Sequence, residues 1–265
     1  MRIKTRLPVP FDVRLMNFTA SALFLAFGLL LVATAGWWAL SHPRFALGGI
    51  TVQGDVTHAS VVTMRANALP RLTGNFFMVS LDATRQAFES VPWVRKAVVR
   101  REFPNRLRVS LQEHRAVAIW GPENDGKLVN SFGEMFEANV GDVEQNLPRL
   151  AGPDGQSAQV LAMYQALVPL FQPLDLGVEQ LLLTGRGSWR VTLDTRAEVE
   201  LGRGSRDEVT ARTRRFLQTL GQVTAKHDRR PEALVSADLR HENGYAVRLR
   251  GVSTTSVDVE KTKKK

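Results

Sequence analysis

The chain has 265 residues, 44% of them hydrophobic, which is enough for two folded domains with buried cores beyond any membrane segment. Its formal net charge is +9, spread over several small clusters, and no nucleic-acid-binding motif accompanies that charge. The sequence contains no cysteine, which excludes disulfides, thiol nucleophiles, iron–sulfur clusters and cysteine zinc sites.

An apolar segment near the N-terminus predicts a membrane-spanning helix. Residues 15–43 contain no Asp, Glu, Lys or Arg, and the most apolar part is residues 18–40. A helix of that length covers about 34 Å, enough to cross a hydrocarbon core about 30 Å thick. The run is too long for the apolar region of a cleaved signal peptide, so we expect an uncleaved anchor. The residues expected to hold it in the membrane are Phe18, Trp37, Trp38 and Leu40.

The charges that flank this segment predict its orientation. The basic residues on its N-terminal side are Arg2, Lys4, Arg6 and Arg14. Only His42 and Arg44 follow it closely. Because positively charged flanks stay in the cytoplasm, we expect residues 1–17 to form a cytoplasmic tail. Everything beyond about residue 42 is then expected outside the cytoplasm, as in a single-pass type II protein.

Residues 45–114 predict a small domain with the element order β-α-α-β-β. Thr57 and Ser80 are suitable N-caps for two helices, and Pro104 with Asn105 supplies the chemistry of a hairpin turn. The expected helices are residues 59–68 and 81–91, and the expected strands are residues 50–52, 94–102 and 107–114. Apolar and polar residues alternate in the last strand, which is typical of a strand with one buried face.

Two aromatic residues and several cations belong to this predicted hairpin. We expect Trp93 and Phe103 to pack in the core. The cations expected on solvated faces of the strand are Arg95, Lys96, Arg100 and Arg101.

A domain of this order directly after a signal anchor resembles a POTRA domain. Residues 91–120 closely resemble the corresponding stretch of the FtsQ/DivIB family of bacterial cell-division proteins. The matching positions are Pro92, Trp93, Arg100, Pro104, Leu107, Val109, Leu111 and Glu113. Ala116 departs from the pattern, because the family usually has proline there. The resemblance implies that this strand region helps to recruit the protein to the division machinery, through Lys96, Val99 and Arg101.

Residues 115–250 predict a second domain of class α+β, with a largely antiparallel sheet and without regular parallel β-α-β units. An amphipathic helix is expected over residues 157–171, broken near Pro169 and Pro173. Ser205 and Glu208 have the spacing of a capping box, which opens a helix to about residue 224. The domain is expected to end in a hairpin whose Asn-Gly turn is residues 242–244.

This second domain also resembles the FtsQ/DivIB family, in residues 188–204 and 235–249. Residues 251–265 form a polar tail, expected to be disordered, so the last strand has no later strand to cover it. The resemblance implies that this end of the domain binds the small division protein FtsB, which is joined to FtsL. Because an open strand edge can pair with a partner strand, we expect binding by strand addition.

The partner-binding residues implied by the resemblance belong to two turns and to the last strand. They are Arg186, His241, Asn243, Gly244, Tyr245, Val247 and Leu249. An alternative stays open at this point: Val247 and Leu249 pack inward, and His241 is a solvated turn residue.

No arrangement of residues indicates catalysis. The five histidines form no metal-binding pair, and neither a phosphate loop nor a nucleophile elbow is present. We therefore expect no cofactor, no metal, no small-molecule substrate and no nucleic acid. The leading hypothesis is a non-catalytic scaffold of the divisome at the bacterial inner membrane, located at the division septum. The alternatives are a POTRA-containing component of a transport or outer-membrane assembly system, and a membrane-anchored periplasmic enzyme.

Overall fold

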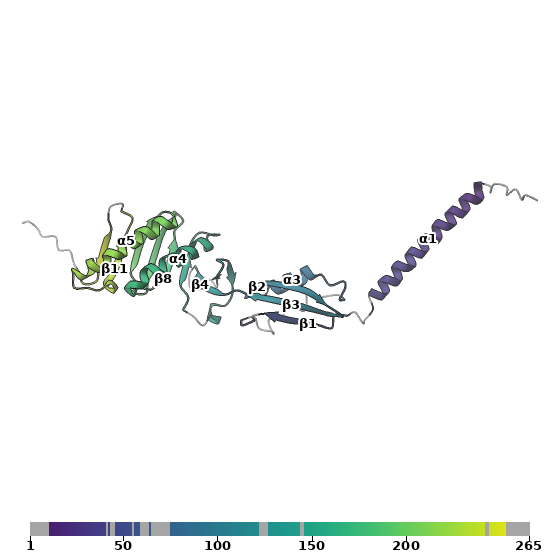
Figure 1. Ribbon diagram of the computed structural model, residues 1–265, viewed down its shortest axis with the longest axis horizontal. Helices are drawn as coiled ribbons and strands as arrows, with labels where there is room; N and C mark the ends of the chain where they lie inside the picture. The colour runs from purple at the N-terminus through teal and green to yellow at the C-terminus, as the bar shows by residue number, and fades with distance from the viewer. Residues whose placement is uncertain are drawn as a thin grey trace, which may run out of the picture. The chain divides into compact units, whose positions relative to one another are not determined.

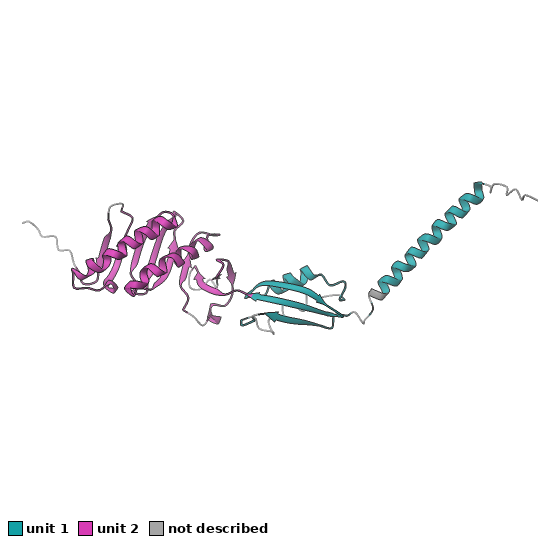
Figure 2. Cartoon of the chain, viewed as in Figure 1, with its two compact units in different colours: residues 1–112 teal, residues 113–265 magenta. Residues whose placement is uncertain are grey.

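The computed structural model describes residues 11–40, 42, 46–54, 56–58, 64, 75–121, 127–143, 146–241 and 244–252. The chain divides into two compact units, residues 1–112 and residues 113–265 (Figure 2). The predicted boundary between the two outer domains, at residues 114 and 115, falls close to this division. The polar tail predicted for residues 251–265 lies outside the described residues beyond Val252.

The first element, α1, is a helix of 30 residues from Phe11 to Leu40 (Figure 1). Its apolar side chains are exposed, and its most apolar window is 0% buried within the protein. Such a helix is apolar on all sides and long enough to cross a bilayer. Phe18, Trp37 and Trp38 are exposed on it, whereas the side chain of Leu40 lies outside the described residues. The helix begins seven residues before the predicted span.

The first unit also contains a three-stranded sheet of the order β1-β3-β2. Its elements are β1 (Gly49–Gly54), α3 (Leu81–Glu89), β2 (Val94–Glu102) and β3 (Arg106–Glu113). Ser80 caps α3 by accepting the N–H of Ala83 at 3.2 Å, as predicted. The helix predicted over residues 59–68 lies outside the described residues except Met64, which is helical and buried. Strand β1 runs parallel to β3.

The structure confirms one of the two predicted core aromatics of this unit and contradicts the other. Trp93 is 4% exposed, whereas Phe103 is 75% exposed. Phe103 occupies the β2–β3 turn, one residue beyond the last residue of β2. A hydrophobic residue in a hairpin turn therefore stays at the surface although its neighbours in the strands are buried.

The second unit is built on one mixed sheet of nine strands, in the order β12-β11-β10-β9-β8-β7-β4-β5-β6. Its first strands are β4 (Ala116–Trp120), β5 (Lys127–Asn130), β6 (Met135–Glu137) and β7 (Arg149–Ala151). The later strands are β8 (Val178–Leu183), β9 (Ser188–Leu193), β10 (Glu198–Arg203), β11 (Leu234–Asp238) and β12 (Ala246–Leu249). Three short 3-10 helices, Val140–Asp142, Gln172–Leu174 and Pro231–Ala233, connect them.

Two helices cover one face of this sheet: α4 (Ser157–Phe171) and α5 (Arg206–Ala225) (Figure 1). They contact each other as well as the strands. Helix α4 connects β7 to β8, and α5 connects β10 to β11, and both strand pairs are parallel. Each of these helices is the crossover that a parallel pair requires, so the sheet contains two β-α-β units although most of its strand pairs are antiparallel, as predicted.

The two helices begin and end where local chemistry places them, with one exception. The capping box predicted from Ser205 and Glu208 is present at the start of α5. The predicted break near Pro169 does not occur, because α4 continues to Phe171, but the α-helix ends two residues before Pro173, as predicted. Phe171 is 0% exposed, and its burial holds the last residues of the helix on the sheet.

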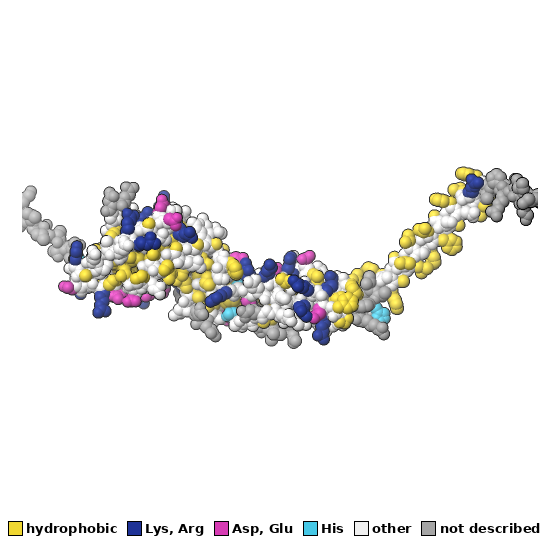
Figure 3. All heavy atoms as spheres, viewed as in Figure 1, with side chains coloured by type: hydrophobic (Ala, Val, Ile, Leu, Met, Phe, Trp, Pro, Cys, Tyr) yellow, Lys and Arg dark blue, Asp and Glu magenta, His cyan; other side chains and the backbone are white. Residues whose placement is uncertain are grey.

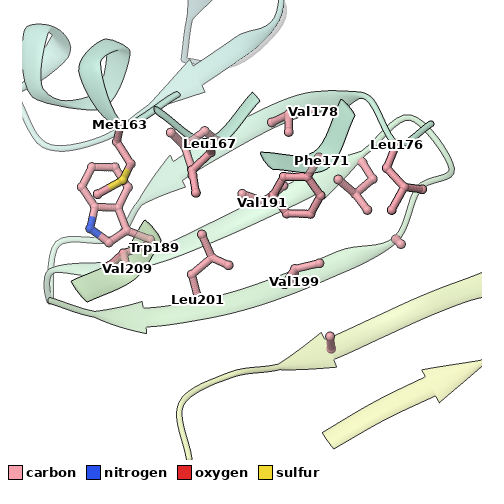
Figure 4. Packing of buried hydrophobic residues seen from close by; sticks show 14 of the residues in the cluster. Met163, Leu167, Phe171, Leu176, Val178, Trp189, Val191, Val199, Leu201 and Val209 are labelled. Atoms are coloured by element: carbon pink, nitrogen blue, oxygen red, sulfur yellow. The ribbon is translucent and has the colours of Figure 1, made fainter. Parts of the chain in front are cut away.

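The core of the second unit lies between these helices and the sheet (Figure 4). Met163, Leu167 and Phe171 of α4 face the side chains of the central strands. Trp189 and Val191 of β9 are among the buried partners, at 2% and 0% exposure. This continuous apolar layer makes the sheet a rigid support for the strands at its ends.

The C-terminal sheet edge as a candidate partner-binding site

Strand β12 is the outermost strand on one side of the nine-stranded sheet. It pairs with β11 in an antiparallel register, with Ala237 opposite Val247 and Asp238 opposite Ala246. Among the residues that the structure describes, no strand pairs with its other side. An unpaired side of a strand presents a row of N–H and C=O groups that a partner strand can use.

The direction of the backbone groups along β12 can be assigned from one hydrogen bond. The N–H of Arg250 donates to the carbonyl of Ala233 at 2.8 Å, so it points toward the β11 side. Backbone groups of an antiparallel strand alternate in direction. The N–H groups of Leu249 and Val247 are therefore directed to the open side.

The side chains of β12 alternate between the core and the solvent. Leu249 is 6% exposed and packs in the core of the unit, and Val247 is half-buried beside it. Ala246 and Arg248 are exposed. Leu249 and Val247 thus pack inward, and in this structure they face a partner only through their backbone groups.

A groove of about 340 Å³ lies where α5 meets the segment that leads into β12. Its lining residues are Arg212, Arg215, Phe216, Thr219, Leu239, His241, Gly244 and Tyr245. Tyr245 is fixed there, because its hydroxyl lies 2.5 Å from Oγ1 of Thr219 and its ring packs edge-to-face on Phe216. Three of the predicted partner-binding residues are therefore brought together.

Sequence reasoning missed the contribution of α5 to this groove. Arg212 and Arg215 are visible in the sequence as part of a basic cluster, but their position beside the last turn depends on the crossover from β10 to β11. Arg212 donates to the carbonyl of Leu201 and, at 3.3 Å, to that of Arg203, so its guanidinium is held over the end of β10.

A bulge in β10 leaves space for the side chains of Arg212 and Arg240. Gly202 has a φ of +81° and lies inside β10 at the irregularity. A Cβ at this position would come within 2.9 Å of Nη1 of Arg212 and 3.1 Å of Cγ of Arg240. Only glycine therefore fits this conformation and this close approach.

The connection from β11 to β12 begins with a salt bridge between neighbouring side chains. Arg240 donates through Nε to Oδ1 of Asp238 at 2.9 Å and through an Nη to Oδ2 at 2.6 Å. The backbone N–H of Arg240 also donates to Oδ1, at 3.0 Å. The hydrogen bonds from the Arg240 side chain lower the pKa of Asp238 from 3.8 to about 2. This arrangement fixes the backbone at the end of β11.

We expect this salt bridge to make the stability of the second unit depend on pH. The pKa of Asp238 is lowered in the folded state, so its stabilisation is complete above about pH 4 and is lost as the pH falls toward 2. Solvent screening limits the effect to about 1 kcal/mol. Asp238→Asn should therefore lower the free energy of unfolding by about that amount at pH 6 and by almost nothing at pH 2, measured by urea denaturation.

Arg240→Gln is the matching variant, since it removes the partner and leaves the carboxylate. It should reproduce the pH dependence of Asp238→Asn in direction. An equal destabilisation of Asp238→Asn at pH 6 and pH 2 would contradict an electrostatic origin.

The remaining predicted residues of this region have different positions. Arg186 is exposed in the β8–β9 turn, and Ser188 at the start of β9 pairs with Arg203 at the end of β10. This turn therefore lies at the same end of the sheet as the last turn, three strand spacings or about 14 Å from β12. His241 and Gly244 are exposed beside the groove, and Asn243 lies outside the described residues.

The three predicted recruitment residues lie on β2, which is an outer strand of the three-stranded sheet. Lys96 is exposed, and Val99 is half-buried against the core. Arg101 is exposed, as predicted, but it also makes hydrogen bonds within the domain. Its guanidinium donates to the carbonyls of Phe76, Phe77 and Val79 at 3.0, 3.3 and 2.9 Å. This structural role was not predicted from the sequence.

We expect Arg101→Met to destabilise the first unit, because the three carbonyls lose their donor. The loss should be about 1–2 kcal/mol in the free energy of unfolding, measured by urea denaturation of the full chain. Arg100→Met is the control on the same strand and should change it by less than about 0.5 kcal/mol. Equal effects of the two substitutions would show that the bonds to the carbonyls contribute nothing.

Within the described part of the chain, no group of three or more His, Asp or Glu side chains could hold a metal ion. The geometry of the C-terminal edge offers backbone pairing, a half-apolar groove and several cations. This combination is suited to binding an extended peptide segment.

Comparison with known proteins identifies the two domains that follow α1. Residues 45–114 match the model of the POTRA domain, FtsQ-type, and residues 118–240 match that of cell division protein FtsQ/DivIB, C-terminal. A "Cell division protein FtsQ" of Thiomonas arsenitoxydans is 40% identical over 92% of this chain and 90% of the relative. The protein of the same name from Burkholderia pseudomallei is 40% identical over 96% of this chain and 99% of the relative. The one from Bordetella pertussis is 36% identical over 90% of this chain and 92% of the relative.

These matches confirm the resemblance predicted from residues 91–120 and from the final strands. They extend over the apolar N-terminal segment and the two domains that follow it, in the same order. The apolar helix α1 is consistent with membrane anchoring. The chain is a member of the FtsQ/DivIB family of bacterial cell-division proteins.

Proposed function

We propose that this protein is a non-catalytic scaffold of the divisome in the inner membrane. Its N-terminus is cytoplasmic, α1 crosses the membrane, and both outer domains are periplasmic at the division septum. Family membership supports a role in cell division, and the four basic residues before the apolar segment support this orientation. The scaffold connects division proteins that arrive early with those that arrive late.

The second domain binds an FtsB–FtsL complex by strand addition along β12. The observation that carries this proposal is the unpaired outer side of β12 among the described residues. A partner strand would accept hydrogen bonds from the N–H groups of Val247 and Leu249. Such pairing explains how residues with inward side chains contribute to binding, because the backbone makes the contact.

Charge around β12 indicates the chemistry of the partner segment. Arg248 and Arg250 are exposed on and after the strand, and Arg215 is exposed beside the groove. A partner segment with acidic residues at alternate positions would face these cations. Arg186 and His241 lie at the end of the sheet where the same segment would enter or leave.

The POTRA domain contributes recruitment through the outer side of β2. Lys96 is exposed there, and β2 is an outer strand of its sheet within the described residues. Val99 packs against the core beneath this strand, and Arg101 fixes the strand to the loop of residues 76–79. The two domains thus offer separate partner surfaces, which is what a scaffold requires.

Hydrogen exchange on the complex tests the proposal. The full chain is reconstituted in nanodiscs and mixed with an FtsB–FtsL complex that carries its own membrane segments. Complex formation should slow exchange in peptides that cover β12 and leave β6, at the opposite side of the sheet, unchanged. Absence of binding would overturn the scaffold assignment for this partner. Binding without protection of β12 would overturn strand addition alone.

A further inference from the structure

Three exposed apolar side chains form a patch at one end of the POTRA domain. They are Phe77, Met78 and Phe103, which are 37%, 54% and 75% exposed, and we call them the POTRA tip. The ring of Phe103 lies edge-to-face at 5.6 Å from that of Phe76 and at 6.5 Å from that of Phe77. Phe76 is only 1% exposed, so the patch rests on the core of the domain.

The backbone under the POTRA tip is held in place. The N–H of Phe77 donates to Oδ1 of Asn75 at 2.8 Å, and that of Met78 to the Asn75 carbonyl at 3.0 Å. Arg101 binds three carbonyls of the same loop. The loop that carries two of the tip residues is thereby fixed to β2, whose end leads into Phe103. An apolar surface that is held in this way is a preformed binding surface.

The POTRA tip lies at the end of the domain that is nearest to the membrane helix along the chain. Ala46 forms a β-bridge with Asn75, and the N–H of Gly48 donates to the carbonyl of Asn105 at 2.8 Å. Six residue steps separate Leu40 at the end of α1 from Ala46. A fully extended chain covers about 3.5 Å per residue, so this end is tethered within about 21 Å of the end of α1.

We propose that the POTRA tip inserts into the interfacial layer of the membrane that α1 spans. The polar interface on each side of the hydrocarbon core is several ångströms thick, and aromatic side chains concentrate there. Hydrophobic side chains gather at this end of the domain in Figure 3. The tether limits the distance between Ala46 and the end of α1, and insertion removes the apolar surface of the patch from water.

A cation near the POTRA tip, Arg106, is also suited to contact with a lipid surface. Arg106, the first residue of β3, is exposed and belongs to no salt bridge among the described residues. It follows Phe103 by three positions, so it can face lipid phosphates when Phe103 enters the interface. Insertion would restrict the tilt of the POTRA domain on the bilayer, because the tether and the patch would hold it at two points.

The absence of cysteine makes a direct test possible. A single cysteine at Met78 is labelled with an environment-sensitive fluorophore, and the full chain is reconstituted in vesicles of phosphatidylcholine and phosphatidylglycerol. Met135, which is 40% exposed in the second unit, is the matched control for the label. Quenching is measured with lipids that carry a nitroxide near the headgroup, and with iodide in water.

The label at position 78 should be quenched by the nitroxide lipid at least about threefold more than the label at position 135. Phe103→Ser should reduce that quenching to the level at position 135. Phe132→Ser, at another exposed phenylalanine in a hairpin turn, should leave it unchanged. Both variants are checked by circular dichroism, and neither removes a buried side chain.

Three results would overturn the proposal. Equal lipid quenching at positions 78 and 135, with full access to iodide, would show that the tip stays in water. Shielding of position 78 from both quenchers would show that a second copy of the chain covers it. A further series in vesicles without phosphatidylglycerol measures the contribution of charge. Loss of insertion in these vesicles would assign the binding to Arg106 instead of the aromatic side chains.

Discussion

Val247→Pro should weaken the binding of FtsB–FtsL by about 10- to 100-fold without unfolding the domain. Proline removes the N–H that points to the open side of β12, and its ring obstructs a strand that approaches there. The loss of one or two strand–strand hydrogen bonds accounts for the lower limit, since about 1.4 kcal/mol corresponds to tenfold. Titration of nanodisc-bound chain with labelled FtsB–FtsL measures the change.

The position within β12 makes this test specific. Val247→Ala keeps the N–H and should change the affinity by less than about threefold. Arg248→Pro removes an N–H that points toward β11, so it should destabilise the β11–β12 pair itself. If Val247→Ala and Val247→Pro weaken binding equally, the side chain makes the contact and the strand-addition mechanism is wrong.

Phe216→Ala should produce the largest loss of stability that a single substitution near the site can cause. Phe216 is 1% exposed and belongs to the core of the second unit, and Tyr245 packs on its ring at a centroid distance of 5.0 Å. Truncation of a buried phenylalanine costs about 3–5 kcal/mol. That is a large share of the stability of a typical domain, so the unfolded fraction should rise steeply.

Pulse proteolysis of the full chain across a urea series measures this loss for the second unit. Phe132→Ala is the matched control, because Phe132 is 59% exposed in the β5–β6 turn of the same unit. It should change the midpoint by an amount equivalent to less than about 0.5 kcal/mol. Binding of FtsB–FtsL should also weaken in Phe216→Ala at low urea, since Tyr245 loses the ring that supports it.

Both substitutions act on one continuous arrangement. Helix α5 supplies the ring under Tyr245, Tyr245 leads into β12, and β12 presents the open backbone. The salt bridge of Asp238 and Arg240 fixes the other end of the same connection. Both Phe216→Ala and Val247→Pro should therefore weaken the binding of FtsB–FtsL. Only Phe216→Ala should also lower the urea concentration at which the second unit unfolds.

The sequence alone determined those features that depend on neighbours along the chain. The uncharged apolar run predicted α1, although the helix begins at Phe11 and not at residue 18. Ser80 and Ser205 were recognised as N-caps, and the β2–β3 hairpin was predicted from turn residues and alternation. The caps and turns depend on residues within four positions of each other, so periodicity and residue type carry the information.

The tertiary structure alone decided which strands are neighbours and which side chains are covered. The sequence did not place β11 beside β10, nor the cations of α5 beside the last turn, because both depend on a crossover of 30 residues, 204–233. Leu249 and Phe103 have similar apolar side chains, yet one is buried and the other exposed. Burial depends on what packs over a residue, and that is supplied by segments remote in the chain. For the same reason the sequence predicted correctly that Arg101 is exposed, but not that the fold brings three carbonyls to its guanidinium.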